Sequence, residues 1–372
     1  MLVTGGAGFI GGHLVDVLIR DGYRVRALDH LAPPVHNGRL PEWFNKKAEF
    51  IKGDVCLKGD WVRALRGVSY VFHLAAYMDF HPDFSAFITT NVASAALLYE
   101  VIREKKYPVR KVIVASSQSV YGEGKYLCKK HGVVYPKERL EADLLAGRWA
   151  IRCSQDGTVM RYLPEREDDQ LFPLNLYGVS KKSLEDVVLD LGKLNDIPSV
   201  ALRYTIVHGP RQTFRHFYSG ALRQFAVMAL AGEPICMHED GQQIRDFVHI
   251  DDLIRAHLLV LKDKRADFQI FNIGSGRADT VFNLAKTVAR VLEIPFHYEL
   301  LGIYRVGTAR HSLADIGKIK KLNWRPRHTL EDNVRDYITW IKKYPEAKKY
   351  LHKALKDLDK SGFVKKPASR NH

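Results

Sequence analysis

The chain has 372 residues, of which 46% are hydrophobic and 27% are charged. These proportions are ordinary for a soluble globular protein, and the length allows one large domain or two moderate ones. No run approaches the roughly 18 to 20 uninterrupted apolar residues of a membrane span, and no basic segment followed by an apolar one marks a secretory signal. Four scattered cysteines do not make a disulfide framework, so we expect a cytoplasmic protein without a membrane partner.

The formal net charge of +15 raises the question of nucleic-acid binding. Much of the excess lies at residues 342–366, and no RNA- or DNA-binding motif accompanies it. We therefore interpret this stretch as a solvated basic helix and tail and expect no nucleic-acid partner. Basic groups elsewhere are available for an anionic small molecule.

Apolar strands alternate with helices from the start of the chain. Strands are predicted at 2–4, 24–29, 48–55, 68–76 and 109–117, with helical spacing after the first strand and again at 93–106. This alternation is typical of an α/β fold, a Rossmann-type doubly wound parallel sheet with right-handed crossovers. Further strands at 200–207 and 268–274 extend the sheet.

The domain prediction follows from this pattern. Residues 1–207 are expected to form a Rossmann domain, with a loop insertion at about 123–172 that breaks the alternation. Residues 208–340, which are richer in turns, are expected to form mainly a smaller C-terminal substrate-binding lobe, with some return to the sheet. Residues 341–372 are the basic tail.

A glycine loop follows the first strand. Gly5, Gly8 and Gly11 lie in a G-x-x-G-x-x-G pattern between a strand and a helix, which suits the diphosphate of a dinucleotide at a helix N-terminus. Asp29 ends the next strand, where its carboxylate can accept hydrogen bonds from ribose hydroxyls and repel a 2′-phosphate. Asp54, after the third strand, is placed to meet the adenine edge. The predicted cofactor is NAD rather than NADP.

A second motif carries acid–base chemistry. Tyr177 and Lys181 form a Y-x-x-x-K pair one helical turn apart, so they share a face of the helix. An ammonium beside a phenol favours the phenolate, which can take a proton from an alcohol while hydride leaves for the nicotinamide. Ser117, which ends the strand VIVASS, can hydrogen-bond the same hydroxyl.

Taken in order, the motifs resemble those of the extended short-chain dehydrogenase/reductase family, most closely the nucleotide-sugar 4-epimerases. They are TGGAGFIG, HLAA, the pair Asn91-Val92, SSQSVYG, YGVSK, LRYTIVHGPRQ, EDGQQIRDFVHIDD, FNIGSG and RVGTARH, spread over residues 1 to about 340. The resemblance implies that Ser117, Tyr177 and Lys181 are catalytic and that Lys181 also holds the nicotinamide ribose. It also implies the NAD-binding set Gly5, Gly8, Phe9, Ile10, Gly11, Asp29, His30, Asp54, Val55, Leu74, Ala75, Ala76, Asn91, Ser116, Tyr177, Lys181, Tyr204, Ile206 and Val207.

The two residues after Ser117 separate reactions within this family. Relatives that eliminate water carry an Asp-Glu pair there, whereas this chain has Gln118 and Ser119, neither of which titrates. The leading hypothesis is therefore a redox-neutral 4-epimerase that oxidises the sugar C4 hydroxyl transiently and returns hydride to the other face. The alternatives are a net NAD(H)-dependent oxidoreductase acting on a 4-keto sugar or a steroid-like alcohol, and a non-catalytic NAD-sensing or RNA-binding protein.

The resemblance also predicts the substrate side and the assembly. Arg211, Arg245 and Arg305 are expected to hold the diphosphate of a nucleotide sugar, because a guanidinium binds it in a bidentate manner. Tyr121 is a further candidate, and Arg310 and His311 are weaker ones; each arginine could instead be a surface charge. Ile206 replaces an asparagine found in many relatives, so sugar recognition should differ from that of the galactose-type enzymes. A homodimer is expected through the helices that carry Tyr177 and Asn91.

The insertion contains two pairs of metal-ligating residue types. Cys128-x-x-His131 and Cys153-x-x-Asp156 are separated by about twenty residues, which is similar to a zinc knuckle. Two ordinary thiols in an adaptable loop remain the alternative. A similar insertion occurs in sequences that resemble dTDP-L-rhamnose 4-epimerase, which favours a dTDP-linked 6-deoxyhexose as substrate.

Overall fold

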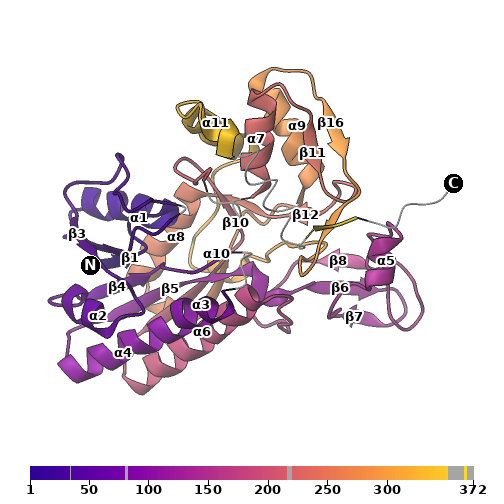
Figure 1. Cartoon of the computed structure of the whole chain (residues 1–372). Coiled ribbons are helices and arrows are strands. Elements are labelled where there is room, and N and C mark those ends of the chain that lie inside the picture. Colours follow the sequence, from indigo (N-terminus) through magenta and orange to yellow (C-terminus); the bar gives the residue numbers. More distant parts are fainter. Residues whose placement is uncertain (34, 80–82, 216–219, 351–363, 367–372) are drawn as a thin grey trace.

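A twisted sheet of parallel strands forms the centre of the molecule (Figure 1). The computed structural model describes residues 1–33, 35–79, 83–215, 220–350 and 364–366. Leu2 pairs with Arg26 on one side and Val71 on the other, so the first strand lies inside the sheet. The strand order is β14 (Ile270–Ile273), β9 (Ser199–Tyr204), β5 (Lys111–Ser117), β4 (Tyr70–His73), β1 (Leu2–Thr4), β2 (Arg26–Asp29) and β3 (Glu49–Lys52). This arrangement confirms the predicted doubly wound α/β fold.

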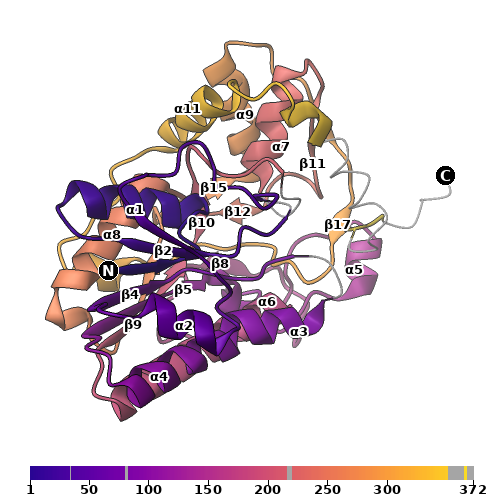
Figure 2. The ribbon, with the colours of Figure 1, turned by 60° about the vertical axis from the view of Figure 1, so that its left-hand side comes forward.

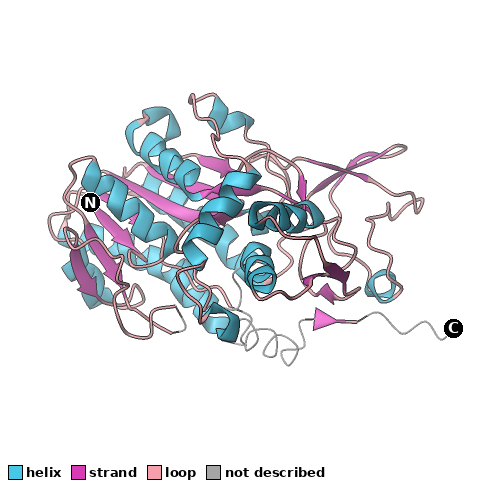
Figure 3. Ribbon diagram, turned by 90° about the horizontal axis from the view of Figure 1, so that it is seen from above, coloured by secondary structure: helices cyan, strands magenta, loops and turns pink. Residues whose placement is uncertain are grey.

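Helices cover both faces of the sheet, as Figures 2 and 3 show from two further directions. On one face, α1 (Phe9–Arg20), α8 (Ile250–Lys262) and α10 (Gly317–Lys320) contribute buried side chains such as Leu14, Leu253 and Ile319. On the other face, α2 (Lys58–Ala64), α4 (Ser94–Lys105) and α6 (Leu176–Leu194) contribute Trp61 and Leu98, among others. Buried apolar surface on both faces explains why the strands are nearly continuous hydrophobic runs.

The predicted strand at 200–207 is two strands that belong to different sheets. Thr205 still donates its amide to Ile273 of β14, but the next amide, that of Ile206, donates to Asp246. From there β10 (Ile206–His208) pairs with β13 (Phe247–His249). This change of partner leads the chain out of the central sheet and into the second lobe.

The second lobe has its own core above the carboxyl ends of the strands (Figure 1). It consists of α7 (Ala221–Leu230), α9 (Val281–Leu292) and α11 (Leu330–Ile341), together with the pairs β11 (Ile235–Met237) with β16 (Tyr298–Leu300) and β12 (Ile244–Arg245) with β15 (Asp279–Thr280). Between these elements, α8, the 3₁₀ turn η3 (Lys264–Ala266) and β14 return to the first core.

The insertion is more ordered than the predicted loop. It forms a three-stranded antiparallel sheet of β7 (Gly132–Val134), β6 (Lys125–Cys128) and β8 (Arg161–Leu163), with the short helix α5 (Glu141–Leu145). A small core of its own contains Tyr126, Cys128, Ile151, Cys153 and Met160. Its strands are only three or four residues long, which is too short for a clear period-two pattern.

Two further segments bear on the predictions. The helices α3 (Phe84–Ile88), η1 (Thr89–Ala93) and α4 form one stretch of 22 residues that is long and apolar enough to cross a membrane by composition alone. Leu98 and Val101 on this stretch are fully buried in the core under the sheet, which accounts for its apolar character. Most of the basic tail lies outside the described residues, and β18 (Val364–Lys365) pairs with β17 (Tyr304–Arg305).

Candidate active site

The glycine loop is packed too closely for side chains. Gly5 has φ +64°, and a Cβ there would lie 3.0 Å from the amide nitrogen of Ala75, in the segment after β4. A Cβ on Gly11 would lie 2.1 Å from the carbonyl oxygen of Gly5, which no rearrangement of side chains could relieve. Gly8 stands at the N-terminus of α1, where no side chain caps the helix. The free amides and the helix dipole are therefore open to a diphosphate.

Asp29 is the last residue of β2, and Asp54 follows β3 at the same edge of the sheet. One Asp29 carboxylate oxygen accepts the amide of Ala7 at 3.1 Å, and the other accepts the amide of Leu31 at 2.9 Å. Burial raises the pKa of Asp29, but hydrogen bonds from His30, Leu31 and Ala7 outweigh it, so the net pKa lies below the ordinary value. Asp54 accepts the amide of Cys56 at 2.8 Å. Both carboxyl groups border the central cavity.

This cavity of about 860 Å³ runs from the glycine loop to the second lobe. It is large enough for two connected ligands of nucleotide size. Among the residues predicted from sequence, it is lined by Gly5, Gly8, Phe9, Ile10, Gly11, Asp29, His30, Asp54, Val55, Leu74, Ala75, Ala76, Ser116, Ser117, Tyr177, Tyr204, Ile206, Val207, Arg211, Arg245 and Arg305.

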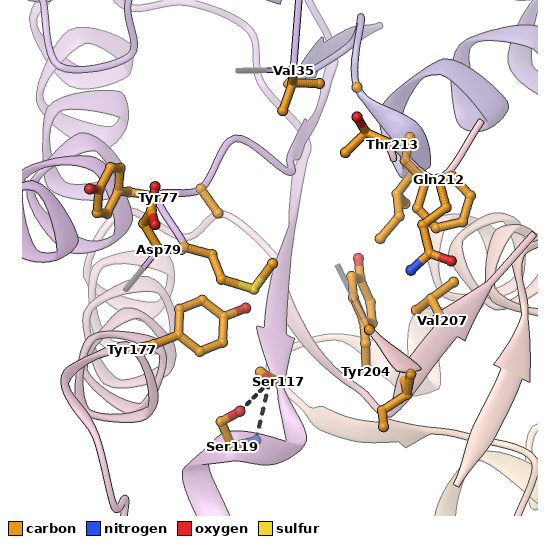
Figure 4. Close-up of a pocket in the computed structure, with 18 of the residues that line it drawn as sticks. Val35, Tyr77, Asp79, Ser117, Ser119, Tyr177, Tyr204, Val207, Gln212 and Thr213 are labelled. Atoms are coloured by element: carbon orange, nitrogen blue, oxygen red, sulfur yellow. Dashed lines mark hydrogen bonds between the residues drawn. The ribbon is translucent and has the colours of Figure 1, made fainter. Parts of the chain in front are cut away.

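Ser117 and Tyr177 face the middle of the cavity (Figure 4). Ser117 ends β5, and its hydroxyl accepts the amide of Ser119 at 3.1 Å and lies 3.1 Å from the Ser119 hydroxyl. Tyr177 stands in the first turn of α6, which begins sharply because Asn175 accepts the amide of Gly178 at 2.9 Å. The end of a strand and the start of a helix thus bring two hydroxyl groups to one wall.

Lys181 lies behind Tyr177 rather than on the cavity wall. Its Nζ is 5.7 Å from the centroid of the Tyr177 ring and donates to the carbonyl oxygen of Ala115 at 2.8 Å. Burial lowers the pKa of Lys181 to about 7, partly opposed by the negative charge of Glu185. The ammonium is within range to favour a phenolate on Tyr177, while ribose contact would require a bound cofactor to approach it.

Two further predicted site residues lie outside the cavity. The side chain of Asn91 is buried, where it bonds the backbone amide and carbonyl of Tyr77 at 2.8 and 3.0 Å and the Ser180 hydroxyl at 2.9 Å. It therefore positions the cavity wall at Tyr77. The ring of Tyr121 is buried by the 3₁₀ turn η2 (Gln118–Tyr121), which follows β5. Its hydroxyl bonds Asn272 and Arg203, so the predicted substrate contact finds no support in this geometry.

The arginine candidates divide into two groups. Arg211, Arg245 and Arg305 border the cavity, as expected. Arg211 pairs with Asp16 at 2.6 Å and stacks on Trp43, whereas the guanidinium of Arg245 is buried and donates to the carbonyls of residues 244, 309 and 310.

The weaker candidates Arg310 and His311 are structural in this arrangement and lie off the cavity. Arg310 pairs with Glu239 and Asp240 at 2.5 and 2.8 Å. His311 accepts the amide of Ile244 at 3.0 Å, and burial lowers its pKa to about 3.

Several cavity residues were not among those predicted from the sequence. Tyr77 and Asp79 lie on the same side as Tyr177, and Gln212 and Thr213 face them from the opposite side (Figure 4). Trp340 and Tyr344 close the cavity from α11 and the turn after it. The last two are separated from every recognised motif, so only the packing of the second lobe reveals them.

The chain matches a known protein family. Residues 1–151 and 153–274 match the NAD dependent epimerase/dehydratase family. The chain is 32% identical over 349 residues to a dTDP-L-rhamnose 4-epimerase of Burkholderia thailandensis, covering 92% of this chain and 94% of that one. It is 31% identical over 352 residues to a putative UDP-glucose 4-epimerase of Methanocaldococcus jannaschii, covering 92% and 98%.

Among solved structures, the UDP-glucuronic acid 4-epimerase of Bacillus cereus in complex with UDP-glucuronic acid and NAD is similar, with a TM-score of 0.74 and 28% identity over 92% of this chain and 98% of that one. The UDP-glucose 4-epimerase of Thermotoga maritima with UDP-glucose also gives a TM-score of 0.74, with 29% identity and the same coverage.

Proposed function

Because the chain belongs to the NAD-dependent epimerase/dehydratase family, we propose that it is a nucleotide-sugar 4-epimerase. The observation that carries the proposal is the wall formed by Ser117 and Tyr177, which faces the same cavity as the glycine loop. The neighbouring Gln118 and Ser119 bring no titratable group to that wall. Gln118 accepts a hydrogen bond from Ser312 at 2.7 Å. Ser117 and Tyr177, with no titratable group at positions 118 and 119, suit reversible oxidation of an alcohol rather than elimination of water.

The residues present fit NAD. The close-packed loop of Gly5 and Gly11 leaves room only for backbone near the diphosphate, and the α1 amides are free to bind it. Asp29 keeps a negative charge where the adenosine ribose would lie, which disfavours the 2′-phosphate of NADP. When bound, NAD accepts hydride from the sugar and gives it back.

The chain's own groups supply the proton chemistry. Ser117 and Tyr177 orient the C4 hydroxyl of the sugar, and Tyr177 takes its proton as the 4-keto sugar forms. The buried ammonium of Lys181 stabilises the phenolate during this step. The keto sugar then turns about its diphosphate link and presents its other face, and Tyr177 returns the proton to the new alcohol. Trp340 and Tyr344 line the cavity and add apolar surface that disfavours the entry of water.

The substrate side of the cavity fits an anionic ligand with an apolar sugar edge. Arg211, Arg215, Arg245 and Arg305 line the cavity and give it a positive side that suits a diphosphate. Ile206, the position linked above to sugar recognition, lines the cavity and cannot donate a hydrogen bond from its side chain. A 6-deoxyhexose, which lacks the C6 hydroxyl, suits such a wall, and the similarity to a dTDP-L-rhamnose 4-epimerase supports the same choice.

The experiment is incubation with a panel of UDP-, dTDP-, GDP- and CDP-sugars, with the products identified by NMR. Interconversion at C4 of at least one sugar is expected, with dTDP-linked 6-deoxyhexoses reacting best. Tyr177→Phe should lower the rate about 10²- to 10⁴-fold, the range for loss of a general acid–base. Tyr107→Phe is the matched control, because the Tyr107 hydroxyl donates to Val62 at 2.9 Å, outside the cavity.

Two results would contradict the proposal. No interconversion anywhere in the panel would remove the assigned activity. Steady release of NADH with a nucleotide sugar would favour the net oxidoreductase, because a redox-neutral epimerase must keep its reduced cofactor bound.

A homodimer in the cytoplasm completes the proposal. The helices α3 and α6 pack against each other and expose Phe84, Ile88 and Val179 on adjoining turns. An apolar face of this kind is suited to a second copy of the chain. None of the four cysteines forms a disulfide, in keeping with a reducing compartment.

A further inference from the structure

The insertion ends in two tight turns that face each other, on the projecting sheet of β6, β7 and β8 (Figure 1). In the first turn, between β6 and β7, the backbone amides of Lys130 and His131 point at the sulfur of Cys128. In the second, the Cys153 amide bonds the Thr158 carbonyl at 2.9 Å, and the Gly157 amide bonds the Cys153 carbonyl at 2.9 Å. Paired hairpin turns of this kind are the layout of zinc ribbons.

The four candidate ligand atoms converge on one point. The Nδ1 of His131 lies 3.4 Å from each of the sulfurs of Cys128 and Cys153. The Oδ2 of Asp156 lies 3.9 Å from the Cys128 sulfur and 3.7 Å from the His131 Nδ1. All four atoms lie within 4.8 Å of one another.

These separations match the edges of a metal tetrahedron. Zinc bonds of about 2.3 Å to sulfur and about 2.0–2.2 Å to nitrogen or oxygen place tetrahedral ligand atoms roughly 3.4–3.8 Å apart. The four measured distances of 3.4, 3.4, 3.7 and 3.9 Å fall at or next to this range.

The surrounding contacts orient the ligands. The other oxygen of Asp156 accepts the amide and the hydroxyl of Thr158 at 3.0 and 2.7 Å, which turns Oδ2 toward the cluster. Both cysteines are buried in the small core of the insertion, whereas His131 and Asp156 close the outer side. Hydrogen-bonded ligands of this kind are typical of metal sites in proteins.

We propose that Cys128, His131, Cys153 and Asp156 bind one structural zinc ion. Two thiolates and one imidazole select zinc over the oxygen-seeking Mg²⁺ and Ca²⁺, and four protein ligands leave no open position for catalysis. The ion joins the two turns of an insertion that has only a small apolar core. The proposal does not depend on the sugar-epimerase assignment.

The insertion that the ion would hold together also contacts one wall of the cavity. Arg139, between the two turns, pairs with Glu123 at 3.2 Å and with Glu239 at 2.8 Å, and it donates to the Thr308 carbonyl at 2.9 Å. Glu239 and Thr308 both border the cavity. Arg139 therefore connects the insertion to two residues of the cavity wall.

The test begins with the metal content of the full chain, purified without a histidine tag from zinc-supplemented cells and measured by mass spectrometry. One zinc per chain is expected. Cys128→Ser and Cys153→Ser should each lose most of it, whereas Cys236→Ser, on β11 in the other lobe, should retain it. Asp156→Cys supplies a stronger ligand and should hold zinc more tightly against a chelator.

Cobalt substitution covers the case in which a cysteine variant does not fold. The unaltered chain, stripped of metal and loaded with Co²⁺, should show the intense visible bands of tetrahedral cobalt and a sulfur-to-cobalt charge-transfer band. Removal of zinc from the unaltered chain should lower its melting temperature, and added zinc should restore it. A zinc-free protein without these cobalt bands, or a Cys128–Cys153 disulfide found by peptide mapping, would overturn the proposal.

Discussion

Lys181 lies beside the catalytic Tyr177, but its buried environment disfavours a positive charge. Its side chain is buried, with the Ala115 carbonyl as a hydrogen-bond acceptor, and burial lowers its pKa to about 7. A lowered pKa means that the unfolded chain binds this proton more tightly than the folded one. The charge therefore opposes folding in full below pH 7, and the opposition disappears as pH rises to the unfolded value near 10.5.

The first prediction concerns Lys181→Met in protein stripped of nucleotide. The variant should lose epimerase activity by at least about 100-fold, because the phenolate is no longer stabilised. It should nevertheless be as stable as the parent or more so at pH 7, with the burial cost of up to about 5 kcal/mol removed. Urea unfolding at pH 7 and pH 9 should show this advantage shrinking with rising pH. A constant difference across pH would show that Lys181 keeps its ordinary pKa.

A second prediction concerns the glycine loop. Gly11→Ala places a Cβ against the Gly5 carbonyl, so the loop must move and bound NAD should fall to a small fraction of the normal content. Gly59→Ala is the matched control, because Gly59 lies in α2 with no atom near its added Cβ. That control should keep its NAD and gain about 0.5–1 kcal/mol in unfolding free energy. NAD released by denaturation and assayed enzymatically provides the measurement. Retention of full NAD by Gly11→Ala would contradict the diphosphate position.

At the scale of elements, the connection from the insertion to the second lobe depends on a buried acid. Glu165 follows β8, and its carboxyl group bonds the Tyr162 hydroxyl and the amide of Leu313. Burial raises the pKa of Glu165 to about 8. The folded chain therefore holds this proton up to about pH 8, whereas the unfolded chain releases it near pH 4.5. Folding thus becomes progressively less favourable as the pH rises from 4.5 to 8.

The third prediction follows from this sign. Glu165→Gln keeps the neutral shape, so its stability relative to the parent should rise between pH 5 and pH 8, by up to a few kcal/mol. Denaturant unfolding at several pH values measures the difference. Glu138→Gln, at an exposed position in the same insertion, should show no such trend. A flat difference for Glu165→Gln would mean that the acid is ionised in the folded protein.

The elements also show how much of the fold and of the site could be predicted from the sequence alone. The central strands could be predicted because each is buried on both faces, which leaves an unbroken apolar run such as that of β5. The glycine loop, Asp29, Ser117 and Tyr177 could be predicted because local spacing places them at strand ends or helix starts. The change of sheet at Ile206 could not be recognised, because its new partner, Asp246, lies far away along the chain.

The cavity side chains that the second lobe contributes could not be predicted from the sequence for the same reason. Trp340 and Tyr344 enclose the cavity only because α11 packs over α9 and α7. The four ligand types of the insertion were visible in the sequence, but their convergence was not, since it depends on two turns more than twenty residues apart. For Tyr121, the position in a motif predicted a contact with the substrate, whereas the structure buries the ring at the η2 turn.

At the scale of the whole molecule, the net charge opposes dimerisation, whereas exposed apolar surface favours it. The chain carries a formal charge of +15, so two copies repel at low ionic strength. The proposed dimer face on α3 and α6 is apolar instead, and these two helices lie side by side in Figures 1 and 2. Salt screens the repulsion and leaves apolar burial intact. A dimer made in this way should therefore tighten as salt is added, unlike one held by ion pairs.

The fourth prediction tests this dimer by sedimentation at roughly 50 and 500 mM salt, where the screening length falls from about 14 Å to about 4 Å. The parent should be dimeric, with a lower dissociation constant at the higher salt concentration. Val179→Asp places a charge at the face and should yield a monomer. Leu230→Asp is the matched control, because Leu230 is equally exposed, at 41% for both residues, but lies on α7 in the second lobe. If both variants stay dimeric, the interface lies elsewhere; if the dimer weakens with salt, ion pairs rather than this apolar face hold it.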